Sequence, residues 1–496
     1  SPEERTPPSD TNEHRVLEIR LGQAVLMALA NNRALSVQRL APDIQRTFEA
    51  EERALFDPVL SADLFTEQGN DEDPSISTNS SDVTTIKRTG GSLGITELLP
   101  TGTKIGVNVS TERKADGGAD DEYATRAEID ASQALLQGRP IAVNLIRLHQ
   151  ARLDTEISEY ELRGFAETLV ATVEGAYWEC VLAHRRAEIV EKSMTLAQQQ
   201  LKEIEHRIRV GDLPETELAA AQAETALRNE ELINARSAIA ASRLRLLRLI
   251  DPDTLNGPRR ELVLRTEPAV PDIPLDSTGS HVDMALKMRP DINEARLRVK
   301  RDDLELVQTK NGLLPKLDLF VLLGKTGYSE SFGDSASEIG GDNYDLSAGI
   351  RFEFPIGNRA AAARHQRARF TREQTAEALN NLADLVRVDV ESAFIEVERT
   401  KAQVIATATT RHFQEEKVRA ETAKFNVGRS TALLVTQAQR DLVVSQVSEV
   451  DAVIRHLEAL VLLFRLEGTL LERRGLSAPG RIPVKEAQTV APANTR

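Results

Sequence analysis

The sequence predicts a mainly α-helical fold with a β part, built from a duplicated chain. Ala28-Leu29 recurs as Ala285-Leu286 after 257 residues, and Val210-Gly211 recurs as Val427-Gly428 after 217 residues. The shorter second spacing means that the first copy carries about 40 extra residues, inserted between roughly 65 and 130. A duplicated chain predicts a quasi-symmetric structure in which each copy supplies equivalent elements.

Two long helices are predicted at 141–210 and 358–427, which contain no proline. Each would extend about 105 Å at about 1.5 Å per residue. In the first, apolar and small residues keep the alternating four-and-three spacing of a heptad seam, which favours side-by-side helix packing. In the second, Arg411 and Gln414 interrupt the seam.

Each long helix is expected to end at a glycine, Gly211 or Gly428, because glycine tolerates the left-handed conformation just past a helix end. Return helices are predicted at 215–250 and 431–473. A return helix and the helix that precedes the strands together match one long helix in length. We therefore expect each copy to place two short helices in line beside a long one, in antiparallel order.

Strands are predicted at 58–136 and 315–355, where the hydrophobic period changes to two. Leu346, Ile350 and Phe352 share one face of a strand, and Asp345 and Arg351 share the other. The insertion adds a further hairpin, so each chain would supply four to six strands. Three polar stretches are expected to be loops: 68–81, 115–122 and 329–343.

The predicted organisation has five parts. A disordered segment at 1–15 precedes the first repeat at 16–250, which is followed by a linker at 251–281, the second repeat at 282–473 and a tail at 474–496.

Composition argues against several functions. The net charge of −15 and the low aromatic content of 4% disfavour nucleic-acid binding, which needs an excess of Lys and Arg on one face. One cysteine, Cys180, forms no disulfide framework, and the histidines show no metal-ligand spacing. We expect no enzyme activity, no cofactor and no metal site.

Strands with one apolar and one polar face form either a soluble sheet or a barrel. In lipid only a closed barrel satisfies the backbone groups, and the strands of one chain are too few to close a pore. The second alternative therefore requires a symmetric oligomer.

At this point the chain resembles the TolC-like outer-membrane efflux proteins, over about residues 16–475. The marks occur in both copies: Ala28-Leu29-x-Asn31-Asn32, Ala176-Tyr177-Trp178, Leu313-Leu314-Pro315-x-Leu317, Phe425-x-Val427-Gly428 and Ala438-Gln439. The resemblance implies a homotrimer with a transmembrane β-barrel in outer-membrane lipid and a helical barrel in the periplasm. It also implies two partners, a periplasmic adaptor and an inner-membrane pump of a tripartite efflux or type I secretion system.

The resemblance further assigns roles at the helix turns. The implied adaptor-contact tip consists of Val210, Gly211, Leu213, Val427, Gly428 and Thr431. The implied periplasmic gate falls at Glu217, Phe425, Arg429, Ser430, Leu434 and Gln437. This chain departs from the family pattern there: Phe425 lacks a hydroxyl, Ser430 replaces an arginine, and Leu434 and Gln437 replace acids.

An alternative from another class is a periplasmic coiled-coil adaptor or scaffold without a pore. Adaptors also carry a helical hairpin, but this chain has two hairpins, and amphipathic strands are predicted at their opposite ends. The sequence does not select the cargo.

We hypothesise that Glu217 and Arg429 retain part of the latch that closes the gate. Charge reversal by Glu217→Lys is then expected to raise the single-channel conductance in planar bilayers, because it replaces an attraction by a repulsion. Unchanged conductance would count against the latch.

Overall fold

The computed structural model describes residues 17–73, 82–116, 121–252, 262–271 and 274–484. The predicted disordered segment at 1–15 lies outside these residues. The chain divides into two compact units, called here the helical unit (residues up to Pro42, Ser158–Ala295 and Leu379 onward) and the sheet unit (Asp43–Ile157 and Arg296–Ala378). Across the described part of the chain, no helix is apolar enough over a sufficient length to cross a membrane.

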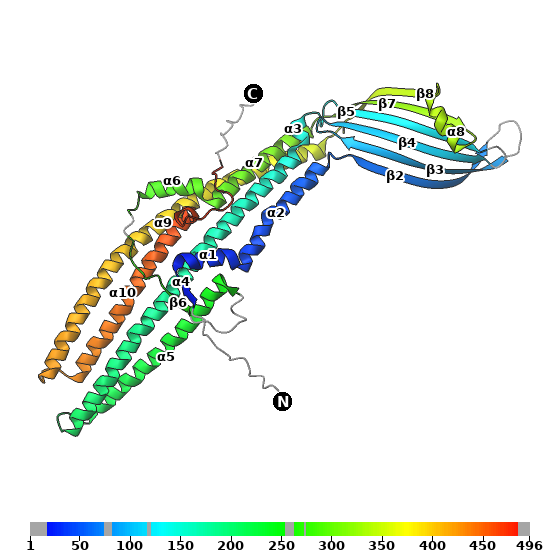
Figure 1. Ribbon diagram of the computed structural model, residues 1–496. Coiled ribbons are helices and arrows are strands. Elements are labelled where there is room, and N and C mark those ends of the chain that lie inside the picture. Colours follow the sequence, from blue (N-terminus) through cyan, green and yellow to red (C-terminus); the bar gives the residue numbers. More distant parts are fainter. Residues whose placement is uncertain (1–16, 74–81, 117–120, 253–261, 272–273, 485–496) are drawn as a thin grey trace, which may run out of the picture. The chain divides into compact units, whose positions relative to one another are not determined.

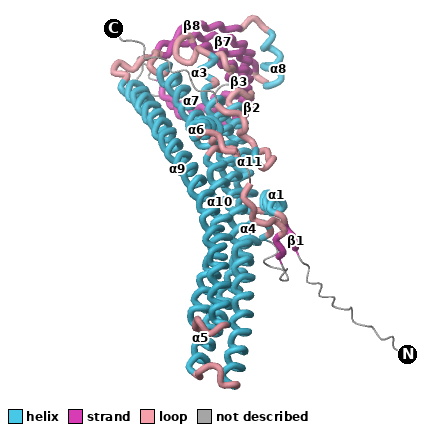
Figure 2. Tube along the Cα trace, turned by 90° about the vertical axis from the view of Figure 1, so that its left-hand side faces the viewer, coloured by secondary structure: helices cyan, strands magenta, loops and turns pink. Residues whose placement is uncertain are grey.

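Two helical hairpins dominate the helical unit (Figures 1 and 2). The 64-residue helix α4 (Ile146–Arg209) turns into α5 (Thr216–Ile250), and the 68-residue helix α9 (Arg359–Asn426) turns into α10 (Ala432–Leu466). The return helices α5 and α10 both contain 35 residues. Cys180, Ala187, Val190 and Ile204 of the predicted seam are buried, so the heptad pattern marks the packed face of α4.

The helices that precede the strands are broken, whereas the sequence pattern predicted continuous ones. The first is divided into α1 (Leu21–Asn31) and α2 (Arg33–Ala54), and the second into α6 (Thr278–Met288) and α7 (Pro290–Asn311). Asn32 caps α2 by accepting a bond from the Leu35 amide at 3.1 Å. Arg289 is extended because the following proline disfavours the helical conformation. Both breaks fall at equivalent positions of the two copies, 257 residues apart.

The second return helix ends earlier than its predicted bound of 473. Gly468, with φ +70°, follows α10 and is succeeded by the short helix α11 (Leu470–Arg473). A Cβ at this position would lie 2.8 Å from the Arg289 backbone, so the close approach requires glycine. The predicted linker also contains structure, because β6 (Leu262–Leu264) pairs in parallel with β1 (Leu17–Ile19).

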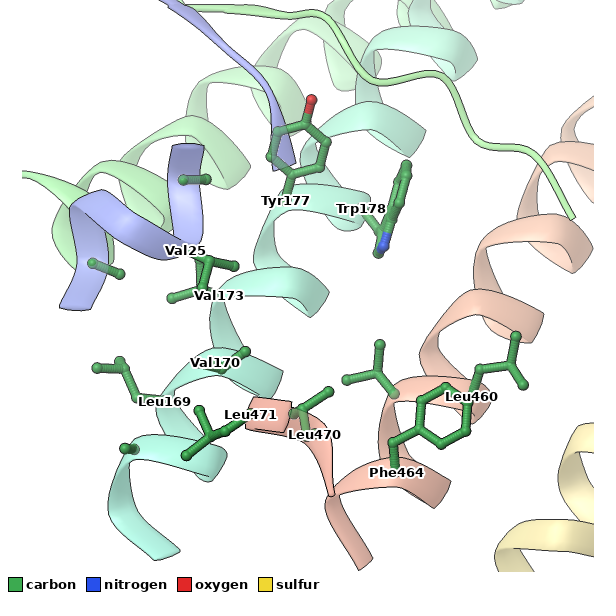
Figure 3. Packing of buried hydrophobic residues seen from close by; sticks show 14 of the residues in the cluster. Val25, Leu169, Val170, Val173, Tyr177, Trp178, Leu460, Phe464, Leu470 and Leu471 are labelled. Carbon is green, nitrogen blue, oxygen red and sulfur yellow. The ribbon is translucent and has the colours of Figure 1, made fainter. Parts of the chain in front are cut away.

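The main core of the helical unit surrounds Tyr177 and Trp178 of α4, whose rings meet edge to face at 5.4 Å (Figure 3). Val173 and Tyr177 are fully buried, together with residues from α1, α10 and α11. The Tyr177 hydroxyl donates to the Ile19 carbonyl at 3.2 Å and accepts from the Thr266 amide at 3.0 Å. Tyr177 therefore ties the small β1–β6 sheet to the long helix.

The sheet unit contains six strands in the order β2-β3-β4-β5-β7-β8, all antiparallel. Six is the upper bound of the predicted strand number. Their bounds are Val59–Asp73 for β2, Asp82–Leu98 for β3, Thr103–Asp116 for β4, Glu122–Ala134 for β5, Lys316–Ser329 for β7 and Tyr344–Glu353 for β8. The short helix α3 (Ile141–Asn144) follows β5 before α4 begins.

The stretch 329–343, predicted to be a loop, carries α8 (Phe332–Ser337) and the 3-10 turn η2 (Glu338–Gly340). Ser335 is buried, and its hydroxyl hydrogen bonds with that of Thr125 at 2.7 Å on β5. The backbone of α8 lies so close to Gly327 of β7 that a side chain there would collide with it. The short helix therefore packs on β5 and β7, as Figure 1 shows.

A buried charge cluster connects α4 to the end of the second copy. Arg163, 1% exposed, donates to Glu472 at 2.6 Å and to the Gly468 carbonyl at 3.2 Å. Glu167 lies 3.3 Å from the same guanidinium. Burial raises the pKa of Glu167 to about 8, Arg163 opposes this shift, and Glu472 adds to it. Near neutral pH Glu167 is therefore mostly protonated.

This pKa predicts a falling stability with rising pH. Because the native value of about 8 lies above the ordinary value of 4.5, the folded protein keeps a proton that the unfolded chain releases in this window. Between about pH 4.5 and pH 8 the free energy of unfolding should fall by up to about 1.4 kcal/mol per pH unit. The stability that comes from the retained proton is fully present below pH 4.5 and is lost above about pH 8. Thermal melts of Glu167→Gln should lack this component, whereas the exposed control Glu156→Gln should retain it.

Candidate functional site: the hairpin tips and the apolar sheet face

The two hairpin tips have the same backbone geometry. Gly211 and Gly428 adopt φ +85° and +74°, in the left-handed region. After α4 the Gly211 amide donates to the Ile208 carbonyl at 3.0 Å and the Asp212 amide to the Arg207 carbonyl at 2.8 Å. After α9 the corresponding bonds join Gly428 to Phe425 and Arg429 to Lys424, at the same distances. Each pair forms a Schellman motif, which satisfies helix-end carbonyls and lets the chain reverse.

The predicted tip residues are presented to solvent. Val210 and Val427 are 59% and 69% exposed, and they stand directly before the two glycines. Thr431 caps α10, since its hydroxyl accepts a bond from the Leu434 amide at 3.4 Å. Leu213 is half-buried in the first turn. Each hairpin thus presents an exposed valine beside a fixed turn.

The predicted gate residues are only partly brought together. The Ser430 hydroxyl donates to Glu421 at 2.9 Å, and the Lys424 ammonium and this hydroxyl hold the pKa of Glu421 below its ordinary value. Within the described residues, the structure has no ion pair between Glu217, in the first turn of α5, and Arg429. Leu434 and Gln437 are exposed on α10.

Phe425 makes a contact between the two hairpins near the tips. The Arg207 guanidinium of α4 lies over its ring, 5.4 Å from the centroid. Glu203 pairs with the same arginine at 2.5 Å. A small cavity beneath this contact is lined by the buried side chains of Ile204 and Val435. Because a ring without a hydroxyl still attracts a cation through its face, Phe425 holds the hairpins together without a hydrogen bond.

A charged network between α5 and α10 was missed by the sequence analysis. Glu224, 6% exposed, accepts from Arg228 at 2.8 Å on its own helix and from both Arg440 nitrogens on α10, one of them at 2.8 Å. Arg228, 3% exposed, also donates to Glu231 at 2.7 Å. The buried Glu224 and Arg228, together with the more exposed Glu231 and Arg440, thus form a bridge between the two hairpins.

The sequence contains a signal for the part of this network that lies within one helix. It contains no signal for the connection between the two hairpins. Glu224 and Arg228 are spaced by four residues, which favours an ion pair on one helix face. Arg440 is 216 residues further along the chain, and only the tertiary packing of α5 against α10 brings it to Glu224.

The sheet has one continuous apolar face. Six residues that pair across all six strands form a row on this face: Leu60, Ile95, Val107, Ile129, Leu323 and Leu346. Every side chain in the row is between 45% and 66% exposed. The opposite face carries polar and charged groups, among them Arg126, which donates to Asp345 at 2.7 and 2.8 Å and to Glu128 at 2.9 Å.

Aromatic residues border the apolar face along β8. Tyr344 and Phe352, both strongly exposed, lie eight residues apart on this face. Phe65 and Phe320 lie on the polar face, where their rings cover Gly90 and Gly349. The Phe320 ring also receives the Arg351 guanidinium at 5.5 Å. Only some of the strand aromatics therefore belong to the apolar face.

Comparison with known proteins finds a family that is similar to part of this chain. Over residues 281–469 the chain matches the model of the family described as "Outer membrane efflux protein". The predicted resemblance is confirmed for this segment, which is similar to that family of outer-membrane efflux proteins.

Two curated relatives are similar over part of their length. The chain is 25% identical over 339 residues to the pyoverdine export outer membrane protein OpmQ of Pseudomonas aeruginosa, covering 64% of this chain and 66% of OpmQ. It is 24% identical over 298 residues to the outer membrane efflux protein BepC of Brucella suis, covering 59% of this chain and 61% of BepC. The matched regions are thus less than two thirds of either relative.

Solved structures share the fold over nearly the whole chain. The Campylobacter jejuni CmeC outer membrane channel matches with a TM-score of 0.68 at 14% identity, over 91% of this chain and 86% of that one. The outer-membrane channel OprN matches with a TM-score of 0.69 at 17% identity, over 94% and 98%. The mainly helical fold with a sheet part is therefore confirmed.

The buried network predicts unequal effects of its two ends. Glu224→Ala should destabilise the protein by about 1–3 kcal/mol, because the buried Arg228 loses one of its two carboxylate partners and the bond to Arg440 is lost. Arg440→Ala should cost less, since Glu224 keeps Arg228. Thermal melts in detergent would measure both, and Arg236→Ala, which breaks the exposed pair with Glu191, should change little. Equal effects of all three variants would contradict the assigned role.

Proposed function

We propose that three copies of this chain form an outer-membrane channel, the exit duct of a tripartite efflux or type I secretion system. The sheet would close into a barrel in the outer membrane, and the helical hairpins would enclose a duct in the periplasm. A periplasmic adaptor and an inner-membrane pump would deliver the cargo.

The apolar sheet face carries this proposal. On β8 it extends from Leu346 to Phe352, and on β7 from Leu317 to Leu323. The strands contain between 10 and 17 residues, and a tilted strand needs about 9–11 residues to cross the hydrocarbon core. Tyr344 and Phe352 would then lie near the two interfaces, where aromatic residues of membrane barrels gather.

The hairpin tips support a docked partner. Val210 and Val427 are exposed beside rigid turns, so an adaptor could bind them without ordering a flexible loop. Behind them, Arg207, Phe425 and the Glu224–Arg440 pair hold the two hairpins of one chain together. We propose that these contacts belong to the gate, together with Glu217, Arg429, Ser430, Leu434 and Gln437, and that opening separates the hairpins.

The alternative is a periplasmic scaffold without a pore, and the sheet argues against it. A water-soluble protein rarely leaves an apolar face of this extent uncovered. The two readings differ in whether detergent is needed to extract the protein.

The experiment uses a strain that lacks the protein and expresses the full chain from a plasmid. The channel should fractionate with the outer membrane, migrate as a trimer when unboiled and conduct ions in planar bilayers. Val427→Asp should abolish export while leaving the trimer intact, because a charge at the apolar tip opposes adaptor binding.

A matched control is Val444→Asp, which adds the same charge at an exposed position of α10 away from the turn. Recovery of the protein in the soluble fraction without detergent would overturn the channel. Full export by Val427→Asp would overturn the adaptor contact alone.

A further inference from the structure

We infer that the edge strands β2 and β8 pair between neighbouring copies, so that three copies close a barrel of eighteen strands. The inference rests on the proposed trimer and adds the identity of the seam and the size of the barrel. It depends on the inserted hairpin, on the two free edges and on the stagger of the strands.

The inserted residues belong to the sheet. β3 and β4 form a hairpin at 82–116 and lie between β2 and β5, paired on both sides. Fifteen residue pairs join β3 to β2, and twelve join β4 to β5. The hairpin therefore adds two full strands to each copy, and three copies of a six-stranded sheet supply eighteen.

The two edges are exposed and unprotected. Among the described strands, β2 has β3 as its one neighbour and β8 has β7. Leu64 on β2 is 92% exposed, and Leu346 and Ile350 on β8 are 64% and 66% exposed. Natural sheets shield such edges with bulges, prolines or covering elements, which these two strands lack. Open edges of this kind can pair with another strand.

The directions of the edges suit a head-to-tail ring. Because the sheet has an even number of antiparallel strands, β2 runs away from its helix-proximal end while β8 runs toward it. The β8 strand of one copy and the β2 strand of the next are then antiparallel, and the hydrogen-bond pattern continues across the seam.

The strand ends show a regular stagger. The row of paired residues that starts at Val59, the first residue of β2, passes through Thr96, Gly106, Asp130 and Leu322 and reaches Ser347 on β8. The helix-proximal strand end lies increasingly far from this row from β2 to β7, and equally far on β7 and β8. On β3 it is Leu98, two residues away, and on β8 it is Glu353, six residues away.

This stagger matches a closed, tilted barrel. If the next copy's β2 begins level with Glu353, each copy contributes six residues of stagger for its six strands. One residue per strand is the ratio of an eight-stranded barrel with a shear of 8, in which the strands tilt by about 36°. Membrane barrels tilt by about 35–45°. Closure in this register would therefore give three copies the strand tilt of a membrane barrel.

In the same register, the polar face of β8 continues into the polar face of the neighbouring β2, and the apolar face into the apolar face. With Val59 beside Glu353 of the neighbouring copy, Ser61 pairs with Arg351 on the polar face. Leu60 pairs with Phe352, and Ala62 with Ile350, on the apolar face. A shift by one residue would place apolar side chains in the lumen, so the pleat excludes it.

Eighteen strands make a wide barrel. With strands about 4.8 Å apart and tilted about 36°, the diameter between backbones is about 34 Å, against about 23 Å for the twelve strands that remain without the hairpin. Barrels of 16–18 strands leave an aqueous channel. The insertion therefore fits a duct for bulky cargo.

The test places two cysteines in one chain, Ser61→Cys and Arg351→Cys, in a Cys180→Ser background. Directly paired residues of antiparallel strands have Cα atoms about 4.5–5.5 Å apart, within disulfide range. Oxidised protein, boiled without reductant, should run as a covalent trimer. The control Ser61→Cys with Ile350→Cys puts the thiols on opposite faces and should stay monomeric.

The outcomes separate this inference from the proposed function. A covalent trimer with Gly349→Cys or Glu353→Cys in place of Arg351→Cys would support the same seam with its register moved by two residues. A disulfide within one monomer would overturn the seam. So would the absence of every cross-link in a protein that still forms an unboiled, conducting trimer. If no trimer forms in the unmodified protein, the proposed function itself fails.

Discussion

An apolar sheet face that lies open to water is the constraint on which the rest of this structure depends. The row from Leu60 to Leu346 crosses all six strands, and its side chains remain about half exposed. Burial of apolar area is worth about 25 cal/mol per Å², so a surface of this extent favours transfer out of water. Lipid can cover the face, but only if every backbone group at the sheet edges is paired. The proposed pairing with further copies of the chain would meet both requirements.

The helical unit depends on a different interaction, the packing of its long helices. Long helices gain little stability from propensity and depend on packing, which the small and apolar seam of α4 supplies. Each long helix ends at a glycine, because the backbone there is left-handed and glycine adopts that conformation without strain. The same glycine turn occurs in both copies of the duplication. The breaks at Asn32 and Arg289 are repeated as well, although an amide cap produces one and a following proline the other. Equivalent geometry has thus been kept by different local chemistry.

Buried and partly buried ion pairs join distant segments of the helical unit. The Arg163 cluster and the Glu174–Arg474 pair, with Glu174 fully buried, attach the chain that follows α10 to α4. The Glu224–Arg440 bridge lies between hairpins that a channel would have to separate. A buried ion pair contributes little net stability, yet losing one partner is costly. An ion pair between the hairpins therefore favours the arrangement in which the hairpins lie together. It can break when the hairpins separate, because both side chains are then hydrated.

The sequence determined the features that depend on local periodicity and chain geometry. The duplication, the heptad seam, the glycine turns and the two-sided strands could all be predicted, because each follows from spacing along the chain. The breaks at Asn32 and Arg289 have local causes in a side-chain cap and a following proline, whereas the short helix α8 could not be predicted, since contacts with distant segments stabilise it. The number of strands in the sheet and the Arg440 partner of Glu224 were decided by tertiary structure alone. Pairing between strands and between helices joins residues far apart in sequence, and periodicity carries no information about which distant segment completes a pair.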